Sequence, residues 1–215
     1  MIKLTVIIKR VRENCKVEEL VEFALSPNNN ILNLQQFKPE IVRLLETMRG
    51  MQPKIILEIG TLNGGTLFLF SRVVSNDALL ISLDLPKIIF GKFQIDWRVF
   101  LIKRFSLPHQ KLKFIRANSH KISTLNHVKR FLRGQKLDFL FIDADHSYEG
   151  VKKDFKMYSP LVKDGGLIAF HDIVSKPELF NNVHKFWEEI KNQYNFDEFI
   201  ADRTQITGGI GILKK

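Results

Sequence analysis

The sequence predicts an α/β fold: a doubly wound, mostly parallel sheet with helices on both faces. From Lys54 onward, short continuous apolar runs alternate with segments of helical periodicity. Strands that are buried on both faces and separated by covering helices produce this pattern. The composition, with 45% hydrophobic and 26% charged residues over 215 positions, is that of a globular protein.

Two helices are expected before the sheet begins. In residues 17–25 the apolar side chains fall on one helical stripe. A second helix is expected over residues 39–49, with a proline in its first turn and Gly50 as its stop. We therefore predict an N-terminal helical extension over residues 1–50 and a sheet-forming domain over residues 51–215.

The sheet-forming domain should contain five strong strands, each a short apolar run: residues 54–59, 78–83, 112–116, 137–142 and 166–170. Helices are expected between and after them, over residues 65–74, 119–132, 148–161 and 181–194. Two further strands would form an antiparallel pair at the sheet edge, residues 196–200 and 209–213, separated by a turn at residues 207–209.

The connection over residues 86–111 is longer than an ordinary link between a strand and a helix. Its aromatic residues are Phe90, Phe93, Trp97, Phe100 and Phe105. Long connections in compact domains often act as lids or binding loops, so the first three aromatics are candidates to cover a substrate. Packing of one helix onto the core is the alternative explanation.

The net charge of +10 comes from one part of the sequence. Residues 97–137 contain eleven lysines and arginines and no acidic residue. Such a segment would attract an anionic substrate, a nucleic acid or a membrane surface, because like charges on one face add their fields. An ordinary solvated basic face is the alternative.

Several protein classes are excluded. The only cysteine is Cys15, which rules out an internal disulfide framework and a multi-cysteine zinc site. No apolar run reaches the ~18 residues that a membrane helix needs. The apolar run near Met1 is too short for a secretory signal. We therefore expect an unexported, cytoplasmic protein that does not insert into membranes.

A glycine-rich turn follows the first strand of the sheet. Gly60, Gly64 and Gly65 would let the backbone approach a ligand, and free N–H groups at the next helix start would face an anionic group. The spacing is Gly-x-x-x-Gly-Gly, which differs from the Gly-x-Gly-x-x-Gly pattern of dinucleotide-binding folds. A plain tight turn is the alternative.

Polar residues also end the next two strands. Asp84 would accept the two hydroxyls of a ribose, which together with the glycine turn indicates a nucleoside cofactor. Asn118 and Ser119 would contact an adenine or cap the helix that follows.

The fourth and fifth strands end in acids and histidines. Since these strands should be neighbours, Asp143, His171 and Asp172 would converge on one divalent cation. His146 would instead take a proton from a substrate hydroxyl. In a purely structural alternative, the acids cap helices and pair with His171.

In their order and spacing these motifs resemble class I S-adenosylmethionine-dependent methyltransferases, and more narrowly the subgroup with the cephalosporin-hydroxylase-like and the macrolide or sugar O-methyltransferase proteins. The resemblance covers about residues 35–213. It rests on five segments: residues 58–66, 82–84, 138–151, 165–166 and 171–172.

The resemblance implies a seven-stranded sheet that binds S-adenosylmethionine. The methionine end would lie on the glycine turn, the ribose on Asp84 and the adenine beside Asn118. The implied cofactor-binding residues are Glu58, Gly60, Thr61, Gly64, Gly65, Thr66, Asp84, Asn118, Ser119 and Asp143. Related metal-dependent enzymes hold Mg²⁺ on acids that map to Asp143 and Asp172, so Mg²⁺ or Mn²⁺ is a candidate. His171 stands where relatives often have an oxygen ligand, which favours a softer metal.

We therefore expect transfer of a methyl group to a hydroxyl of a small molecule or sugar, with His146 and Asp143 as the catalytic residues. An anionic acceptor would suit the basic segment. Three alternatives are open: a nucleic-acid methyltransferase or binding protein that uses residues 97–137, a nicotinamide-dependent oxidoreductase, and a cofactor-binding sheet without catalysis. The N-terminal extension would close over the site or pair with a second subunit.

Overall fold

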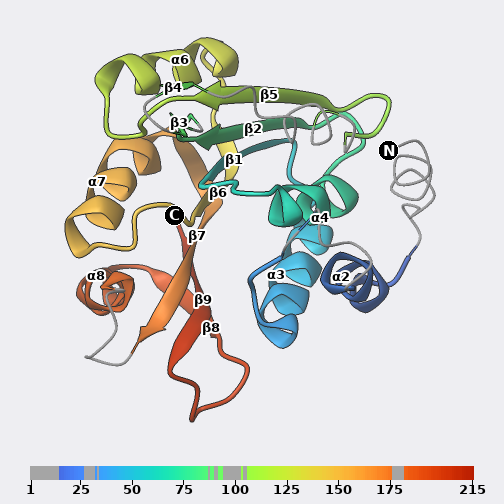
Figure 1. Cartoon of the computed structure of the whole chain (residues 1–215), viewed down its shortest axis with the longest axis vertical. Helices are drawn as coiled ribbons and strands as arrows, with labels where there is room; N and C mark the ends of the chain where they lie inside the picture. The colour runs from blue at the N-terminus through green and yellow to red at the C-terminus, as the bar shows by residue number, and fades with distance from the viewer. Residues whose placement is uncertain are drawn as a thin grey trace.

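A computed structural model describes residues 15–26, 32, 34–86, 88–89, 92–93, 103, 106–175 and 182–215. Within them, seven strands form one sheet in the order β5-β2-β1-β6-β7-β9-β8 (Figure 1). The strands are β1 (Ile55–Ile59), β2 (Leu79–Asp84), β5 (Lys111–Arg116), β6 (Leu137–Ile142), β7 (Val162–Ser175), β8 (Asn195–Phe199) and β9 (Thr207–Lys214). A separate antiparallel pair joins β3 (Ile88–Ile89) to β4 (Lys92–Phe93).

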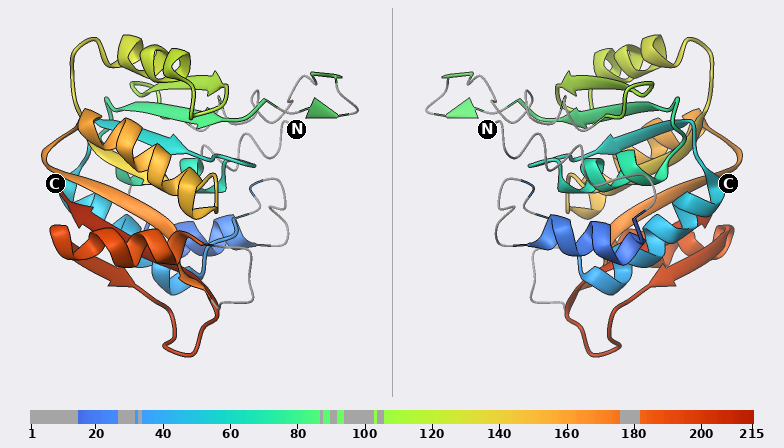
Figure 2. Two further views of the ribbon diagram at one scale, coloured as in Figure 1. Left: turned by 90° about the vertical axis from the view of Figure 1, so that its left-hand side faces the viewer. Right: turned by 90° about the vertical axis from the view of Figure 1, so that its right-hand side faces the viewer.

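Helices cover both faces of the sheet (Figure 2). One face carries α2 (Val17–Leu25), α3 (Lys38–Met51) and α4 (Gly65–Val73). The other carries α6 (Ile122–Leu132), α7 (Tyr148–Tyr158) and α8 (Val183–Ile190), and short 3₁₀ turns follow α7 and α8 at Ser159–Leu161 and Lys191–Gln193. The doubly wound α/β fold predicted from the sequence is confirmed.

The pairing of the strands decides where a ligand can bind. The five strands from β5 to β7 are parallel, whereas β9 runs antiparallel to β7 and β8 antiparallel to β9. The carboxyl ends of the parallel strands therefore share one edge of the sheet. Open α/β sheets bind their ligands at this edge.

Each face of the sheet has its own hydrophobic core. On the first face the ring of Phe70 packs edge-on against Phe139 and Phe141, at centroid distances of 5.5 and 5.4 Å. On the second face Phe170 packs against Phe186 and Trp187, at 6.1 and 5.7 Å. Because both faces are covered, all five residues of β1 are buried, which explains the continuous apolar runs in the sequence.

The N-terminal helices belong to the first of these cores. Ile41, Leu44, Leu45 and Met48 of α3 are fully buried in the cluster that also holds residues of α4 and of the sheet. The buried Glu40 accepts hydrogen bonds from Gln205 Nε2, at 2.7 Å, and from the N–H of Gly209, at 2.9 Å. Helix α3 is therefore tied to β9 as well as to α4.

Several predicted boundaries were wrong. Helix α3 does not stop at Gly50 but runs to Met51, with Gln52 as its C-cap residue. Residues 207–209 are not a turn: Thr207 begins β9, and the connection from β8 covers residues 200–206. The strand starts early because Asp172 and Glu40 accept hydrogen bonds from the N–H groups of Gly208 and Gly209. Strand β7 likewise extends beyond residues 166–170, and α6 begins at Ile122 rather than at residue 119.

Part of one prediction lies outside the described residues. It concerns the aromatic side chains of the long connection: the candidates to cover a substrate, Phe90, Phe93 and Trp97, and the two further aromatics Phe100 and Phe105. Among the described residues, no helix is both long enough and apolar enough to cross a membrane.

Candidate active site

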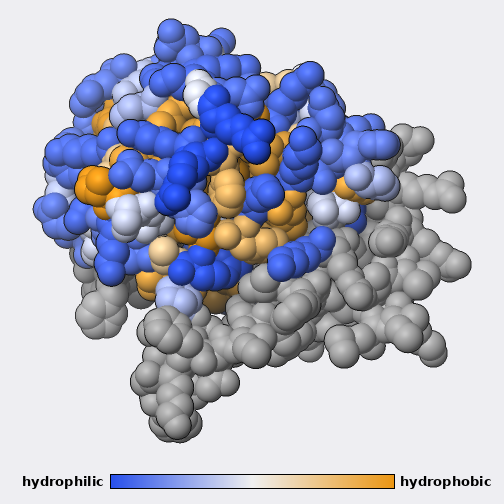
Figure 3. All heavy atoms as spheres, turned by 90° about the horizontal axis from the view of Figure 1, so that it is seen from above, coloured by the Kyte–Doolittle hydropathy of each residue, from blue (hydrophilic) through white to orange (hydrophobic). Residues whose placement is uncertain are grey.

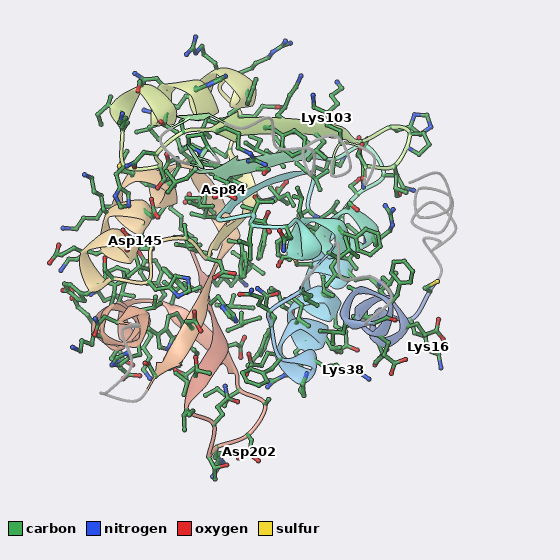
Figure 4. All side chains as sticks on the ribbon, viewed as in Figure 1. Lys16, Lys38, Asp84, Lys103, Asp145 and Asp202 are labelled. Carbon is green, nitrogen blue, oxygen red and sulfur yellow. The ribbon has the colours of Figure 1, made fainter. Side chains whose placement is uncertain are left out.

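A pocket of about 730 Å³ opens at the carboxyl ends of the parallel strands. Its wall contains most of the predicted site residues: Gly60, Thr61, Gly65, Thr66, Asp84, Asn118, Ser119, Asp143, His146, His171 and Asp172. Glu58 and Gly64 do not line it; Glu58 is fully buried on β1, and Gly64 precedes α4. Asp84 and Asp145, both labelled in Figure 4, enter the pocket from β2 and from the loop after β6.

Gly60 closes the floor of this pocket. Its φ of 91° lies in the left-handed region, and a Cβ atom there would meet the carbonyl oxygen of Asp143 at 1.9 Å. Two backbone hydrogen bonds hold this close approach. The Gly60 N–H donates to the carbonyl of Leu83 at 2.9 Å, and the Asp143 N–H donates to the carbonyl of Ile59 at 2.8 Å. Only glycine allows the two loops to approach this closely.

Asp84 is held in place by the loop opposite. Its Oδ2 accepts from the N–H of Leu62 at 2.9 Å and its Oδ1 from the N–H of Leu85 at 2.7 Å. A carboxylate oxygen has more than one acceptor position, so each oxygen can still accept a ligand hydroxyl. The geometry suits the ribose role that the sequence predicts.

Glu58 is a fully buried acid that forms no ion pair among the described residues. Both carboxyl oxygens are buried and form no hydrogen bond within the described chain. Burial raises the pKa of Glu58 from 4.5 to about 8, and the charges of Asp143 and Asp84 act in the same direction, although Thr61 and Arg116 oppose them. Glu58 is therefore largely neutral at pH 7 and would ionise if a cation came within reach.

The turn after β5 does not follow the alternative in which Asn118 or Ser119 caps the next helix. Helix α6 has Lys121 as its N-cap residue and no side-chain cap. Asn118 Oδ1 instead accepts from the N–H of His120 at 2.8 Å, which makes a tight turn. The carbonyl of Ser119 accepts from the Tyr158 hydroxyl at 2.7 Å, so α7 supports this turn from behind.

His120 joins the same region to a buried acid. Its Nε2 lies 3.3 Å from Asp154 Oδ1, and the Asp154 side chain is fully buried on α7. Burial raises the pKa of Asp154, against the opposing effects of Ser119 and His120. Sequence reasoning missed His120, although it stands directly after the two residues assigned to the adenine.

Two histidines bridge two carboxylates at the other end of the pocket. His146 Nδ1 lies 2.9 Å from Asp172 Oδ2, and its Nε2 lies 3.9 Å from Asp143 Oδ1. His171 Nδ1 lies 3.3 Å from Asp143 Oδ1 and 3.4 Å from Asp172 Oδ2. Ser147, not an acid, caps α7 by accepting from the N–H of Gly150. In the purely structural alternative the acids would cap helices and pair with His171, and only the pairing with His171 is seen.

The charged groups in this cluster shift one another's pKa values. Hydrogen bonding to Asp172 raises the pKa of His146, whose side chain is 47% exposed. Burial lowers the pKa of His171, but Asp143 and Asp172 outweigh it and raise that pKa to about 10. Burial alone would raise the pKa of Asp172, yet His146 and His171 hold it far below its ordinary value. His171 is therefore held protonated beside the ionised carboxylate of Asp172.

Asp172 has a constrained backbone. Its φ of 64° is unusual for a residue with a side chain, and its Oδ1 accepts from the N–H of Gly208 at 3.2 Å. Residues in such conformations persist where the surrounding structure holds them, often at functional sites. The start of β9 supplies that support here.

The cluster has metal-ligand geometry. Ligand atoms of Asp143, His146 and Asp172 all lie within 4.8 Å of one another. The trio predicted from the sequence contained His171 in place of His146, and His171 contacts the same two acids.

Comparison with known proteins decides the family. Residues 57–173 match the family model described as a methyltransferase domain. The chain belongs to this methyltransferase family.

Three proteins illustrate the likeness. An uncharacterized protein of Acanthamoeba polyphaga mimivirus is 30% identical over 63% of this chain, and the chain spans only 60% of that relative's length. The O-methyltransferase TomG of Streptomyces achromogenes, solved with SAM, has a TM-score of 0.62 at 15% identity, covering 98% of this chain and 94% of TomG. The methyltransferase MycE of the mycinamycin pathway, solved with Mg and SAH, has a TM-score of 0.56 at 17% identity, covering 94% of this chain and 54% of MycE.

Three residues of this methyltransferase pocket lie outside the matched region and were missed by sequence reasoning: Gln35, Gln36 and Thr207. Gln36, just before α3, donates from Nε2 to Asp143 Oδ2 at 3.0 Å and accepts from the Thr66 hydroxyl at 3.2 Å. Gln35 and Thr207 line the same pocket. The only sign of Gln35 and Gln36 in the sequence was that two polar residues precede an amphipathic helix.

Proposed function

We propose that this methyltransferase uses S-adenosylmethionine to methylate a hydroxyl oxygen of a small molecule or sugar. The observation that carries the proposal is one pocket with two chemically different ends. Asp84 and the turn at Asn118 line one end, and the cluster of Asp143, His146 and Asp172 lines the other. The complexes of TomG with SAM and of MycE with Mg and SAH support it by their similar fold.

The cofactor end fits a nucleoside joined to an amino acid. Asp84 would accept the ribose hydroxyls, and the tight turn at Asn118 would border the adenine. Glu58, buried and without an ion pair among the described residues, would ionise to match the positive charge of the amino-acid portion. When bound, S-adenosylmethionine supplies an activated methyl group on its sulfonium.

The acceptor end fits a hydroxyl that must lose a proton. Asp172 orients the His146 ring and raises its pKa, so neutral His146 is a stronger base than an isolated histidine. His146 would take the hydroxyl proton while the pocket holds the oxygen in line with the methyl group. Such alignment removes much of the entropic barrier to the transfer.

The donor set also suits a divalent cation. Asp143 and Asp172 would provide carboxylate oxygens, and His171 a nitrogen, once the cation replaces the charge of its proton. A mixed oxygen and nitrogen set favours Mn²⁺ over Mg²⁺. When bound, the cation would lower the pKa of the acceptor hydroxyl.

Cys15, the only cysteine, supports a reducing cytoplasm as the place of action.

Calorimetric titration of S-adenosylhomocysteine tests the cofactor end. We expect the wild type to bind with a dissociation constant of about 1 µM, and Asp84→Ala to bind at least about 30-fold more weakly because the ribose contacts are lost. Asp164→Ala removes an exposed carboxylate far from the pocket and should bind like the wild type. Added Mn²⁺ or Mg²⁺ in parallel titrations reports whether a cation strengthens binding.

Absence of binding heat for the wild type, with and without either cation, would contradict the proposal. Equal affinities for wild type and Asp84→Ala would leave a cofactor-binding protein but reject the assignment of Asp84. Thermal midpoints of both variants, measured first, separate loss of binding from loss of fold.

A further inference from the structure

A second groove lies at the opposite edge of the sheet from the methyltransferase pocket. It measures about 890 Å³ and is formed where the parallel strands begin. Lys54 precedes β1, Lys111 begins β5, Lys136 precedes β6 and Lys163 lies at the start of β7. No part of the proposed reaction uses this groove.

The groove is strongly basic. Seven cationic side chains line it, against two carboxylates: Lys54, Lys111, Lys113, Arg130, Arg133, Lys136 and Lys163, facing Asp77 and Asp138. Both acids are already engaged. Asp138 accepts from the N–H groups of Lys54 and Ile55 at 2.8 Å and pairs with Lys163, while Asp77 pairs with Lys54 at 3.8 Å.

Five of the cations form no ion pair in the part of the chain that the structure describes, and one of these, Lys136, donates to the carbonyl of Pro160 at 2.7 Å. Lys111, Lys113, Arg130 and Arg133 are exposed, and none of them forms an ion pair with a described carboxylate. Lys111 and Lys113 project from the edge strand β5, whereas Arg130 and Arg133 come from the end of α6. Because these cations come from two different elements and line a groove of about 890 Å³, their fields add over a large concave surface, which favours an extended anion over a single phosphate.

An aromatic ring lies among these charges. Phe131 of α6 lines the groove and is only partly buried. Its ring has Lys113 Nζ 5.6 Å from the centroid and the His127 ring 4.9 Å away. Figure 3, which looks down on the face of α6 and β5, shows hydrophilic side chains spread over this face with hydrophobic surface exposed between them.

We propose that this groove binds single-stranded nucleic acid. Lys111, Arg130 and Arg133 contact successive phosphates, and Phe131 offers a surface on which a base stacks. Spaced cations with an interleaved aromatic side chain are how proteins hold single strands without reading their sequence. The groove is remote from the acid and histidine cluster, so the nucleic acid is a binding partner rather than the methyl acceptor.

Fluorescence anisotropy with labelled oligonucleotides of about 16 nucleotides tests the proposal. The whole chain is titrated into oligo(U) and, separately, into oligo(dT), at salt concentrations from about 50 mM to about 200 mM. We expect affinity to fall steeply with salt. The two probes determine whether RNA, DNA or both are bound.

The main variant is Lys111→Glu, Arg130→Glu and Arg133→Glu together. Loss of three phosphate contacts should weaken binding at least about 10-fold and reduce the slope of log affinity against log salt by about 2. The matched control is Lys153→Glu, Lys156→Glu and Lys185→Glu, which makes the same charge change on exposed positions of α7 and α8. If both triple variants weaken binding equally, only net charge matters and the groove is rejected.

A second variant tests the aromatic contact. Phe131→Leu keeps an apolar side chain against the core but removes the stacking surface, so it should weaken oligonucleotide binding several-fold and leave binding of inorganic polyphosphate unchanged. Equal affinity of polyphosphate and oligonucleotide of the same charge, with no effect of Phe131→Leu, would overturn the assignment to nucleic acid. So would absence of binding by the wild type at low salt.

Discussion

At the scale of single residues, the most informative side chain is one that the pocket does not expose. Glu58 is fully buried behind the glycine turn, and both of its oxygens lack a partner within the described residues. An unpaired ionised carboxylate costs several kcal/mol in such surroundings, so the folded chain keeps the proton. The stability of the folded chain therefore depends on pH through Glu58, as long as no cation lies close enough to favour its ionised form.

This coupling predicts the sign of a pH effect on stability. The pKa of Glu58 is about 8 in the folded chain, against 4.5 ordinarily, so between these values only the unfolded chain releases the proton. The contribution of Glu58 to stability is therefore full below pH 4.5 and falls as pH rises toward about 8, by an amount on the order of a few kcal/mol.

Thermal unfolding from about pH 5 to about pH 8 measures this effect. Glu58→Gln cannot ionise, so its midpoint should fall less steeply than that of the wild type. Glu46→Gln alters an exposed glutamate and should follow the wild type. Identical slopes for Glu58→Gln and wild type would show that Glu58 is ionised in the folded chain.

At the scale of elements, α7 supports the turn that borders the cofactor end of the pocket. The Tyr158 hydroxyl donates to the carbonyl of Ser119, and Asp154, one turn earlier, contacts His120. The pocket edge thus depends on a helix that contributes Tyr148 to Tyr158 and lies on the second face of the sheet. No sequence pattern indicated this link, because Ser119 and Tyr158 lie 39 positions apart in the chain.

Tyr158→Phe should lower the free energy of unfolding by about 1 kcal/mol, because a partly buried hydrogen bond to the Ser119 carbonyl is lost while the ring remains. Urea unfolding measures the change. The control is Tyr194→Phe, whose ring packs on Phe155 at 6.3 Å and whose hydroxyl has no bond in the described chain. A destabilisation of the same size in both variants would mean that the effect comes from the ring and not from the hydrogen bond.

At the scale of the whole molecule, the helical extension and the sheet share one core. Leu45 of α3 is fully buried together with Phe68, Phe70 and Phe139. Gln36 also connects the helical extension to the sheet, because its side chain donates a hydrogen bond to Asp143. The predicted boundary at residue 50 therefore crosses a region of continuous packing, and the extension contributes to the site.

This arrangement predicts one cooperative unfolding transition. With Trp97→Phe as background, Trp187 is the only tryptophan and reports on the second face of the sheet. Leu45→Ala, on the first face, should cost about 2–5 kcal/mol and shift the urea midpoints of Trp187 fluorescence and of helical circular dichroism together. A shift in circular dichroism alone would show that the extension unfolds separately.

The sequence by itself determined the alternation of strands and helices, and with it the edge at which polar residues such as Asp84, Asp143 and Asp172 gather. Local periodicity and strand order suffice for this, because parallel strands place their carboxyl ends together. Only the tertiary structure decided that Gln36 and His120 reach the pocket, that β9 begins at Thr207, and that seven cations from separate elements line one groove. These features depend on contacts between residues distant in the chain, and such contacts leave no periodic trace in the sequence.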